Sequence, residues 1–284
     1  MGEIVFAAKV THVPTMYLSE QEGPLKGTRA QAIESHKKMG EMVRAAGADT
    51  FVVLDTHWLV NAGYHVNANA VFKGIFTSHE FPHFIQDLQY EYSGNVELGT
   101  LIAEKATARD VLTRAHHLDS LSLDYGTLVP MRYQNPDSAL KVVSVAAWCV
   151  KAQLEESRVF GEALAEAIAA SDSKVALLAS GSLSHQILAN RLSEAGVFEI
   201  SSKFNELVDK MVLDMWTEGR IAEFLEILPE YAHHCSGEAA MHDTAMLFGA
   251  LGWDSYAGRG ELLCDYFPSS GTGQVNVMFT LPDR

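Results

Sequence analysis

The sequence has no long apolar run. No stretch of about 18 uncharged apolar residues occurs in its 284 residues, so we expect no membrane-spanning helix. The N-terminal residues lack the basic segment and apolar run of a secretory signal. Basic residues are few, 21 against 36 acidic ones, and the formal net charge is −15. A surface this acidic repels phosphate backbones and anionic lipids, so we expect neither nucleic acid nor membrane as a partner.

Cysteine is also scarce. The three cysteines, Cys149, Cys235 and Cys264, are scattered and form no CxxC pair. This pattern disfavours a disulfide framework or a zinc knuckle and predicts a reducing, cytoplasmic location. Low-complexity segments, internal repeats and Pro/Ser-rich linkers are absent as well. With 48% apolar and 20% charged residues, we expect a single globular catalytic domain over residues 1–284.

The order of strand-like and helix-like segments predicts the fold class. Apolar runs typical of strands occur at Glu3–Val10, Thr50–Asp55, Lys141–Trp148, Lys174–Ala179 and Val275–Leu281. Helical spacing of apolar residues occurs at Gly27–Ala46, Val96–Ala108, Glu155–Ala170, Ser201–Trp216 and Ala239–Leu251. This alternation predicts an α/β fold, a three-layer α/β/α domain with a central mixed, largely parallel sheet. The aromatic and His-rich segment Leu59–Tyr92 is expected to cross the ligand-binding end of that sheet.

Histidine is abundant, with 12 copies, and two of them follow predicted strands. His12 lies in VTHVP and His57 in FVVLDTHW, so both side chains can converge above the sheet. Glu238, in CSGEAAMHD, is expected at the start of a helix. Two histidines and one carboxylate form the facial triad of Fe(II) oxygenases, which leaves positions open for substrate and dioxygen. Each residue has a simpler alternative: a hydrogen-bonded structural histidine, or a helix N-terminal acid favoured by the macrodipole.

The motifs together resemble the class III extradiol dioxygenases, the LigB-type superfamily. The phrases AAKVTHVPTMYLSE, DTHWLVNAGYHVN, DYGTLVPMRY, ASGSLSH, LPEYAHHCSGE and SSGTGQVN span nearly the whole chain and are closest to the homoprotocatechuate branch. The resemblance implies an enzyme that opens a catechol with O2, most simply 3,4-dihydroxyphenylacetate. It implies Fe(II) held by His12, His57 and Glu238, although Mn(II) or another divalent ion has the same ligand preferences. Enzymes of this kind are usually symmetric, so a homo-oligomer (dimer or tetramer) is expected.

The resemblance also implies roles for residues that do not bind the metal. His185, after the small-residue turn in GSLSH, matches the acid/base histidine of the family. Tyr125, in LSLDYGTLVP, stands where many relatives have a second pocket histidine. It can donate a hydrogen bond but has a much higher pKa, so His116 is an alternative source of an imidazole. His242, four residues after Glu238, is expected to orient that carboxylate.

Residues that contact the substrate are predicted from their neighbourhood. An acetate side chain needs a cation or hydrogen-bond donors, and the candidates are Arg132, Ser182 and Ser184. Trp58 is a candidate for a wall against the catechol ring. The other histidines are expected on the surface or in loops: His36, His65, His79, His83, His233 and His234.

Two other functions fit the same residues. A zinc hydrolase on a related α/β/α scaffold would use the three ligands to activate water. A non-enzymatic metal-binding interaction protein would keep the site without turnover. Iron analysis and measurements of oxygen uptake with catechols distinguish these two functions from that of a dioxygenase.

Overall fold

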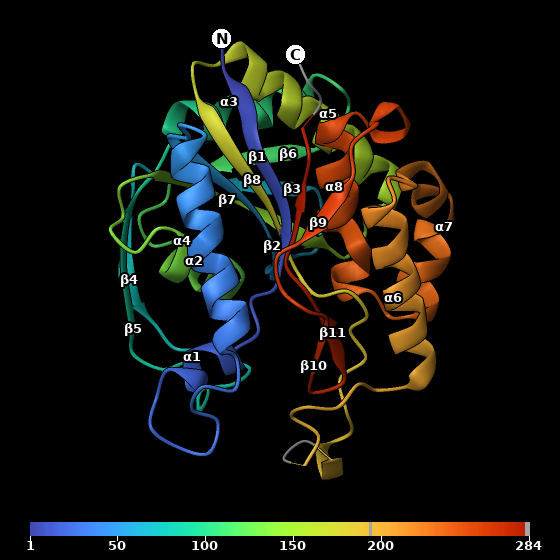
Figure 1. Cartoon of the computed structure of the whole chain (residues 1–284). Coiled ribbons are helices and arrows are strands. Elements are labelled where there is room, and N and C mark those ends of the chain that lie inside the picture. Colours follow the sequence, from blue (N-terminus) through green and yellow to red (C-terminus); the bar gives the residue numbers. More distant parts are fainter. Residues whose placement is uncertain (193–194, 282–284) are drawn as a thin grey trace.

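The computed structural model describes residues 1–192 and 195–281 and has three layers around one large sheet (Figure 1). The eight strands run in the order β6-β3-β7-β2-β8-β1-β12-β9. Four parallel strands form the centre: β1 (Glu3–Val10), β2 (Thr50–Val60), β7 (Lys141–Cys149) and β8 (Lys174–Ser180). One edge is made by β3 (Tyr64–Asn67) and β6 (Thr113–His116), the other by β12 (Val277–Phe279) and β9 (Gly260–Leu262). The antiparallel pairs β3–β7, β1–β12 and β12–β9 make the sheet mixed.

Helices cover both faces because the central strands are apolar on both sides. Along β2, Val52 and Leu54 enter one core, whereas Phe51 and Val53 enter the other. The first core packs under α3 (Val96–Thr107), α5 (Leu154–Ala170) and α8 (His242–Leu251), with α6 (Lys203–Thr217) and α7 (Ile221–His234) beyond them. The second lies under α2 (Ala30–Ala45), α4 (Tyr125–Gln134) and the hairpin β4 (Val71–Phe76) and β5 (Leu88–Ser93). A Cβ on Gly161 or Gly249 would collide with backbone carbonyl oxygens, so glycine lets α5 and α8 pack closely.

The predicted fold class is confirmed, and the predicted strands and helices match observed ones to within a few residues at most ends. The structure adds α1 (Thr15–Ser19), α4, α7 and short strands, including the hairpin β10 (Phe267–Ser269) and β11 (Thr272–Gln274). Two of the added helices contain a proline, Pro130 in α4 and Pro229 in α7, which masked the helical pattern. Within the described ranges, every helix is too short or too polar to cross a bilayer.

The parallel strands end at one edge of the sheet, and this edge carries the candidate site. Val10 of β1 and Asp55 of β2 both pair with Ser180 of β8. The chain that follows each strand therefore leaves the sheet at the same level. The pairing of β2 with β7 is irregular between Asp55 and Leu59, and His57 lies within that irregular segment.

Candidate active site

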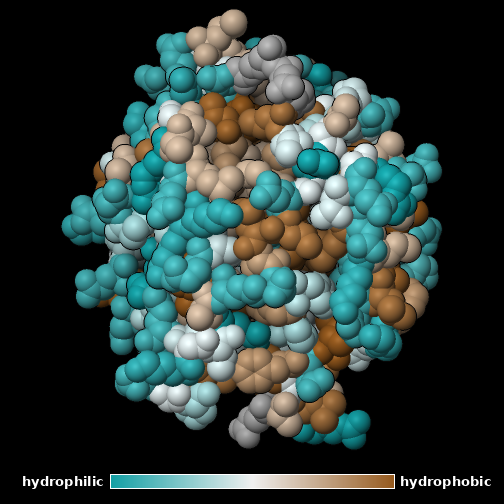
Figure 2. Space-filling view, in the orientation of Figure 1, coloured by the Kyte–Doolittle hydropathy of each residue, from teal (hydrophilic) through white to brown (hydrophobic). Residues whose placement is uncertain are grey.

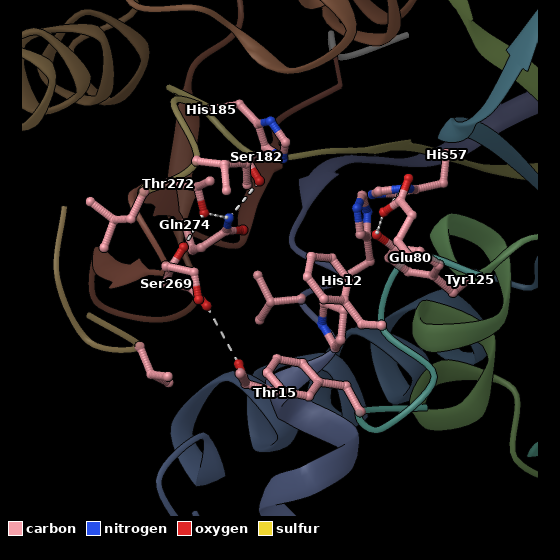
Figure 3. A pocket seen from close by; sticks show the side chains of 18 of the residues that line it. His12, Thr15, His57, Glu80, Tyr125, Ser182, His185, Ser269, Thr272 and Gln274 are labelled. Atoms are coloured by element: carbon pink, nitrogen blue, oxygen red, sulfur yellow. Dashed lines mark hydrogen bonds and ion pairs between the residues drawn. The ribbon is translucent and has the colours of Figure 1, made fainter. Parts of the chain in front are cut away.

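His12, His57 and Glu238 lie close together at this edge. Each offers one ligand atom, and these atoms lie within 4.8 Å of one another. The Nε2 atoms of both histidines lie 3.3 Å from Oε1 of Glu238. The imidazole rings meet edge to face, with centroids 4.8 Å apart. All three side chains are nearly buried, and His12 and His57 face the cavity shown in Figure 3.

The Nδ1 atom of His12, the ring nitrogen that does not face Glu238, is held by a chain of hydrogen bonds. Its Nδ1 lies 3.0 Å from Oγ of Ser180, and that hydroxyl donates to the carbonyl of Gly126 at 2.5 Å. Because the hydroxyl proton is already used, Nδ1 of His12 is the donor. The lone pair of His12 is then on Nε2 and points toward Glu238, which is the tautomer that a metal ligand needs.

His57 is held by the carboxylate of Asp55 two residues earlier. Oδ1 of Asp55 accepts from the backbone N–H of His57 at 2.8 Å, and Oδ2 accepts from the Thr127 hydroxyl at 2.6 Å. Gly126 packs so closely on Asp55 that any Cβ there would collide with the carboxylate. The glycine after Tyr125 is therefore required for α4 to approach the turn that positions His57.

Glu238 is fixed by donors and by an unusual backbone. Thr56 Oγ1 donates to Oε1 at 2.5 Å, and the backbone N–H of Ser182 donates to Oε2. The expected helix start is wrong in detail: Glu238 opens a 3-10 turn, and α8 begins at His242. Ala239, Ala240 and Met241 all have left-handed φ values of 47°, 53° and 62°. Non-glycine residues rarely adopt this conformation, and such strain is concentrated at functional sites.

The charges of the three residues fit a bound cation. Burial lowers the pKa of His57, but its contacts with Glu238 and Glu80 outweigh this and raise it to about 10. Burial acts to raise the pKa of Glu238, but the neighbouring histidines hold it well below its usual range. These shifts favour a proton on His57 beside an ionised Glu238. A divalent ion would replace that proton, and two imidazoles with one carboxylate suit iron, manganese or zinc.

A cavity of about 560 Å³ opens over these ligands, large enough for a small aromatic substrate. Tyr125 lines it, with its ring 3.7 Å from that of His57 between centroids. The Tyr125 hydroxyl donates to Oε2 of Glu80 at 2.9 Å, and the same oxygen lies 3.6 Å from Nδ1 of His57. Burial and the Glu80 carboxylate raise the pKa of Tyr125, so it stays protonated and acts as a hydrogen-bond donor.

His185 also lines the cavity, opposite Tyr125. Its Nε2 lies 3.9 Å from Oε2 of Glu238, beyond hydrogen-bond distance, and its side chain is 28% exposed. Burial lowers the pKa of His185, so the imidazole is neutral near pH 7 and can accept a proton. Its backbone N–H donates to the carbonyl of Ser236 at 3.0 Å, which ties the turn to the segment that leads to Glu238.

The sequence of this chain is similar to those of known proteins. The model of the catalytic LigB subunit of aromatic ring-opening dioxygenase matches residues 6–280. The chain belongs to this LigB family. It is 49% identical over 259 residues to a 3,4-dihydroxyphenylacetate 2,3-dioxygenase of Escherichia coli, covering 91% of this chain and 94% of the relative. It is 22% identical to the 2-aminophenol 1,6-dioxygenase beta subunit of a Pseudomonas species, covering 99% and 95% of the two chains.

The fold recurs at lower identity. A crystal structure of an uncharacterised Escherichia coli K12 protein superposes with a TM-score of 0.64, over 96% of this chain and 98% of that one, at 17% identity. This likeness concerns the fold alone. The predicted resemblance to LigB-type dioxygenases is confirmed by the family match and by the relative at 49% identity.

Four residues of this LigB-family chain lie away from the place predicted for them. His116 ends β6 at the edge of the sheet, and its Nε2 is 2.7 Å from Nδ1 of His65. Trp58 points to the opposite side of β2 from His57 and contacts His65 and His116. Arg132 pairs with Glu20 at 2.8 Å in a separate cavity. Ser184 is fully buried and points away from the cavity, whereas Ser182 lines it.

Two expectations about other histidines are wrong. His242 does not reach Glu238, because its Nδ1 is 2.7 Å from Oγ of Ser157 and the kinked backbone separates the two residues. His36 is fully buried instead of exposed: its Nε2 lies 2.9 Å from the carbonyl of Thr11, next to His12. Burial lowers the pKa of His36 to about 3. From sequence alone, a single histidine in a helix gives no signal of whether its side chain is exposed, is buried or reaches a neighbouring carboxylate.

Two residues that the sequence did not single out, Glu80 and Asp209, and His83, which was expected only on the surface or in a loop, belong to the site or support it. Glu80 and His83 come from the loop between β4 and β5 and line the cavity. Asp209 of α6 is fully buried under the turn that carries His185. Its carboxylate accepts from Ser184 N, Ser184 Oγ, Tyr231 OH and Tyr266 OH at 3.2, 2.7, 2.7 and 2.7 Å. Four donors around one carboxylate make this the anchor of the turn.

The Asp209→Asn variant is expected to lose more than about 3 kcal/mol of unfolding free energy. The amide presents a donor to groups that are themselves donors, and each bond to a charged group contributes about 1.5–3 kcal/mol. Urea unfolding measures the loss. Tyr266→Phe removes only one of the four hydrogen bonds to Asp209. It serves as the matched variant and should lose less unfolding free energy. Equal stability of Asp209→Asn and the unmodified protein would show that the network does not hold the turn.

Proposed function

We propose that this protein is an Fe(II)-dependent extradiol dioxygenase that opens 3,4-dihydroxyphenylacetate to 5-carboxymethyl-2-hydroxymuconate semialdehyde. The observation that carries the proposal is the His12, His57 and Glu238 group at the base of a ring-sized cavity. The 49% identical relative, named for this substrate, supports it. The catechol and dioxygen would be the small-molecule partners.

His12, His57 and Glu238 would hold the ion on one face and leave the side toward the cavity open. A ferrous ion held there would supply Lewis acidity toward a catechol and redox chemistry with dioxygen. Mn(II) suits the same ligands. The buried hydrogen bonds to Ser180, Asp55 and Thr56 keep the ligands in place before the metal arrives, which lowers the cost of binding.

The remaining pocket residues would orient the substrate and manage protons. His185 is neutral and faces the open side of the site, so it is placed to take the proton of a catechol hydroxyl and return it when the ring opens. Tyr125 is held by Glu80 against His57 and would position the ring and an oxygen atom by hydrogen bonding. Ser182 supplies a hydroxyl at the same wall. His116 lies outside the cavity, so we assign the position of the second pocket histidine to Tyr125, as a hydrogen-bond donor.

The proposal is tested with protein loaded anaerobically with Fe(II) and then mixed with oxygenated 3,4-dihydroxyphenylacetate. We expect one O2 consumed per catechol and a yellow semialdehyde, because the ring opens beside the diol. Mass spectrometry identifies the product and electrode measurements follow the oxygen. A muconate diacid, formed by cleavage between the hydroxyls, would contradict the proposal, as would hydrolysis without oxygen uptake. Protein loaded with zinc is the matched control and should consume no oxygen.

We also propose that the enzyme is a cytoplasmic homo-oligomer, a dimer or tetramer. Its three cysteines are free, as is usual in reducing compartments. Apolar patches interrupt the polar surface in Figure 2. On α6, the side chains of Phe204, Leu207 and Met211 are 56%, 56% and 40% exposed. Exposed apolar groups in one helix are typical of subunit contacts, and light scattering of the purified protein measures the mass.

A further inference from the structure

The cavity has no lysine or arginine among the described residues that line it. Among these described lining residues, Glu80 is the one that carries a carboxylate. The protein as a whole carries a formal charge of −15. A substrate with an anionic arm therefore meets an unfavourable field unless a cation lies close behind the wall. The buried Lys9 does not provide this cation, because it is already paired with Asp243.

Arg29 lies behind the wall, just before α2. It is 5% exposed. Its Nε donates to Oγ1 of Thr15 at 3.1 Å, and its Nη2 donates to the carbonyl of Val197 at 3.1 Å. Thr15 and Val197 both line the cavity. The guanidinium is thus one hydrogen bond removed from the space that the substrate would fill.

The charge of Arg29 has no counter-ion in the described part of the chain. Within residues 1–192 and 195–281, no carboxylate oxygen lies within 4.0 Å of the guanidinium, and Nη1 has no hydrogen-bond partner. The rings of Phe198 and Phe267 lie 4.8 and 4.9 Å from Cζ. Burial lowers the pKa of Arg29 to about 10, so it remains a cation at pH 7. A buried cation without an acid is costly, and the cost falls when an anion binds.

Thr15 connects this charge to the cavity. Because Oγ1 accepts from Nε of Arg29, the hydroxyl proton of Thr15 points away from the guanidinium. Oγ of Ser269, which also lines the cavity, lies 3.5 Å from Oγ1 of Thr15, and since either hydroxyl can be the donor, the pair keeps one proton for another acceptor. Figure 3 shows Thr15 and Ser269 joined at the end of the pocket that lies away from His57. Two hydroxyls backed by a guanidinium make a subsite suited to a carboxylate.

We propose that Thr15 and Ser269, backed by the positive charge of Arg29, bind the carboxylate of the substrate side chain and select acidic catechols over neutral ones. The inference rests on the proposed function, and it gives Arg29 the role for which the sequence suggested Arg132. The diol would lie at His12, His57 and Glu238 and the acidic arm at Thr15. The cation–π contacts with Phe198 and Phe267 hold the planar guanidinium in place behind Thr15.

The test compares 3,4-dihydroxyphenylacetate with 4-methylcatechol, which has the same diol and no carboxylate. In Arg29→Met, the ratio of kcat/KM for the acid to that for 4-methylcatechol is expected to fall about 10- to 100-fold, as for the loss of a hydrogen bond to a charged group. The change is expected mainly in KM. Arg29→Lys keeps the positive charge, so this ratio should fall less than in Arg29→Met. Thr15→Val, which keeps the shape of the wall, should shift the ratio in the same direction.

Anaerobic calorimetry of the same ligands gives a readout that does not depend on turnover. Weaker binding of the acid, with a smaller change for 4-methylcatechol, supports the subsite. An equal loss for both ligands would show that Arg29 only braces the wall, and an unchanged ratio in both Arg29→Met and Thr15→Val would overturn the proposal. If the unmodified protein binds the acid but turns over neither catechol, the proposed function fails while the binding ratio still decides the role of Arg29.

Discussion

The Glu238→Gln variant is expected to lose its metal and its ring-cleaving turnover while remaining folded. The amide keeps the shape of the side chain but removes the negative charge that faces His12 and His57 at 3.3 Å. Loss of even an outer partner of a metal ligand weakens metal binding about 10- to 100-fold, so loss of the charge of a ligand should weaken it more. Iron per protomer by plasma spectrometry and oxygen uptake measure the two effects. The His12→Ala and His57→Ala variants are likewise expected to lose the metal and the turnover.

A matched control separates loss of a ligand from loss of a buried side chain. His242 is buried to the same degree as His12, 4% against 3% exposed, but its Nδ1 contacts Ser157 and it has no contact with Glu238. His242→Ala should lower the melting temperature and keep its iron. A Glu238→Gln protein that retained one iron and ordinary turnover would remove Glu238 from the ligand set.

The sequence predicted the parts of the site that depend on local structure. His12 and His57 follow apolar strands, and the parallel register of β1, β2 and β8 brings the ends of these strands together. No tertiary information was needed beyond the rule that ligands bind at the carboxyl edge of such a sheet. The ring-opening chemistry came from the resemblance, because the same three ligands also suit a zinc hydrolase.

The misplaced residues depend on how distant segments pack. Arg132 and Arg29 are equally polar in the sequence, yet α4 turns Arg132 to Glu20, whereas Arg29 reaches Val197, 168 residues away. Asp209 is hidden in the polar pattern of α6, and its buried role appears only when Ser184 is placed above it. The direction of a single side chain depends on how helices and strands pack together. The hydrophobic periodicity of the sequence does not contain that information.

His185→Gln is expected to keep its iron and its affinity for catechol but to lose about 10²- to 10⁴-fold in the rate of the chemical step, the range for a lost general acid or base. His185 lies 3.9 Å from Glu238, too far to be fixed by it, and its neutral imidazole faces the cavity. Glutamine keeps a polar group there but cannot carry a proton between substrate atoms. Iron content, anaerobic catechol binding and single-turnover rate are measured on one preparation.

Three other roles for His185 predict different results from these measurements. A metal ligand would lose iron first, and the affinity for catechol would fall with it. A residue that only supports the turn would resemble Tyr266→Phe, which weakens the network around Asp209, and would lower the melting temperature more than the rate. If iron, affinity and rate are all ordinary in His185→Gln, that histidine moves no essential proton. Tyr125 is then the next residue to test, because its hydroxyl is held in the same cavity by Glu80.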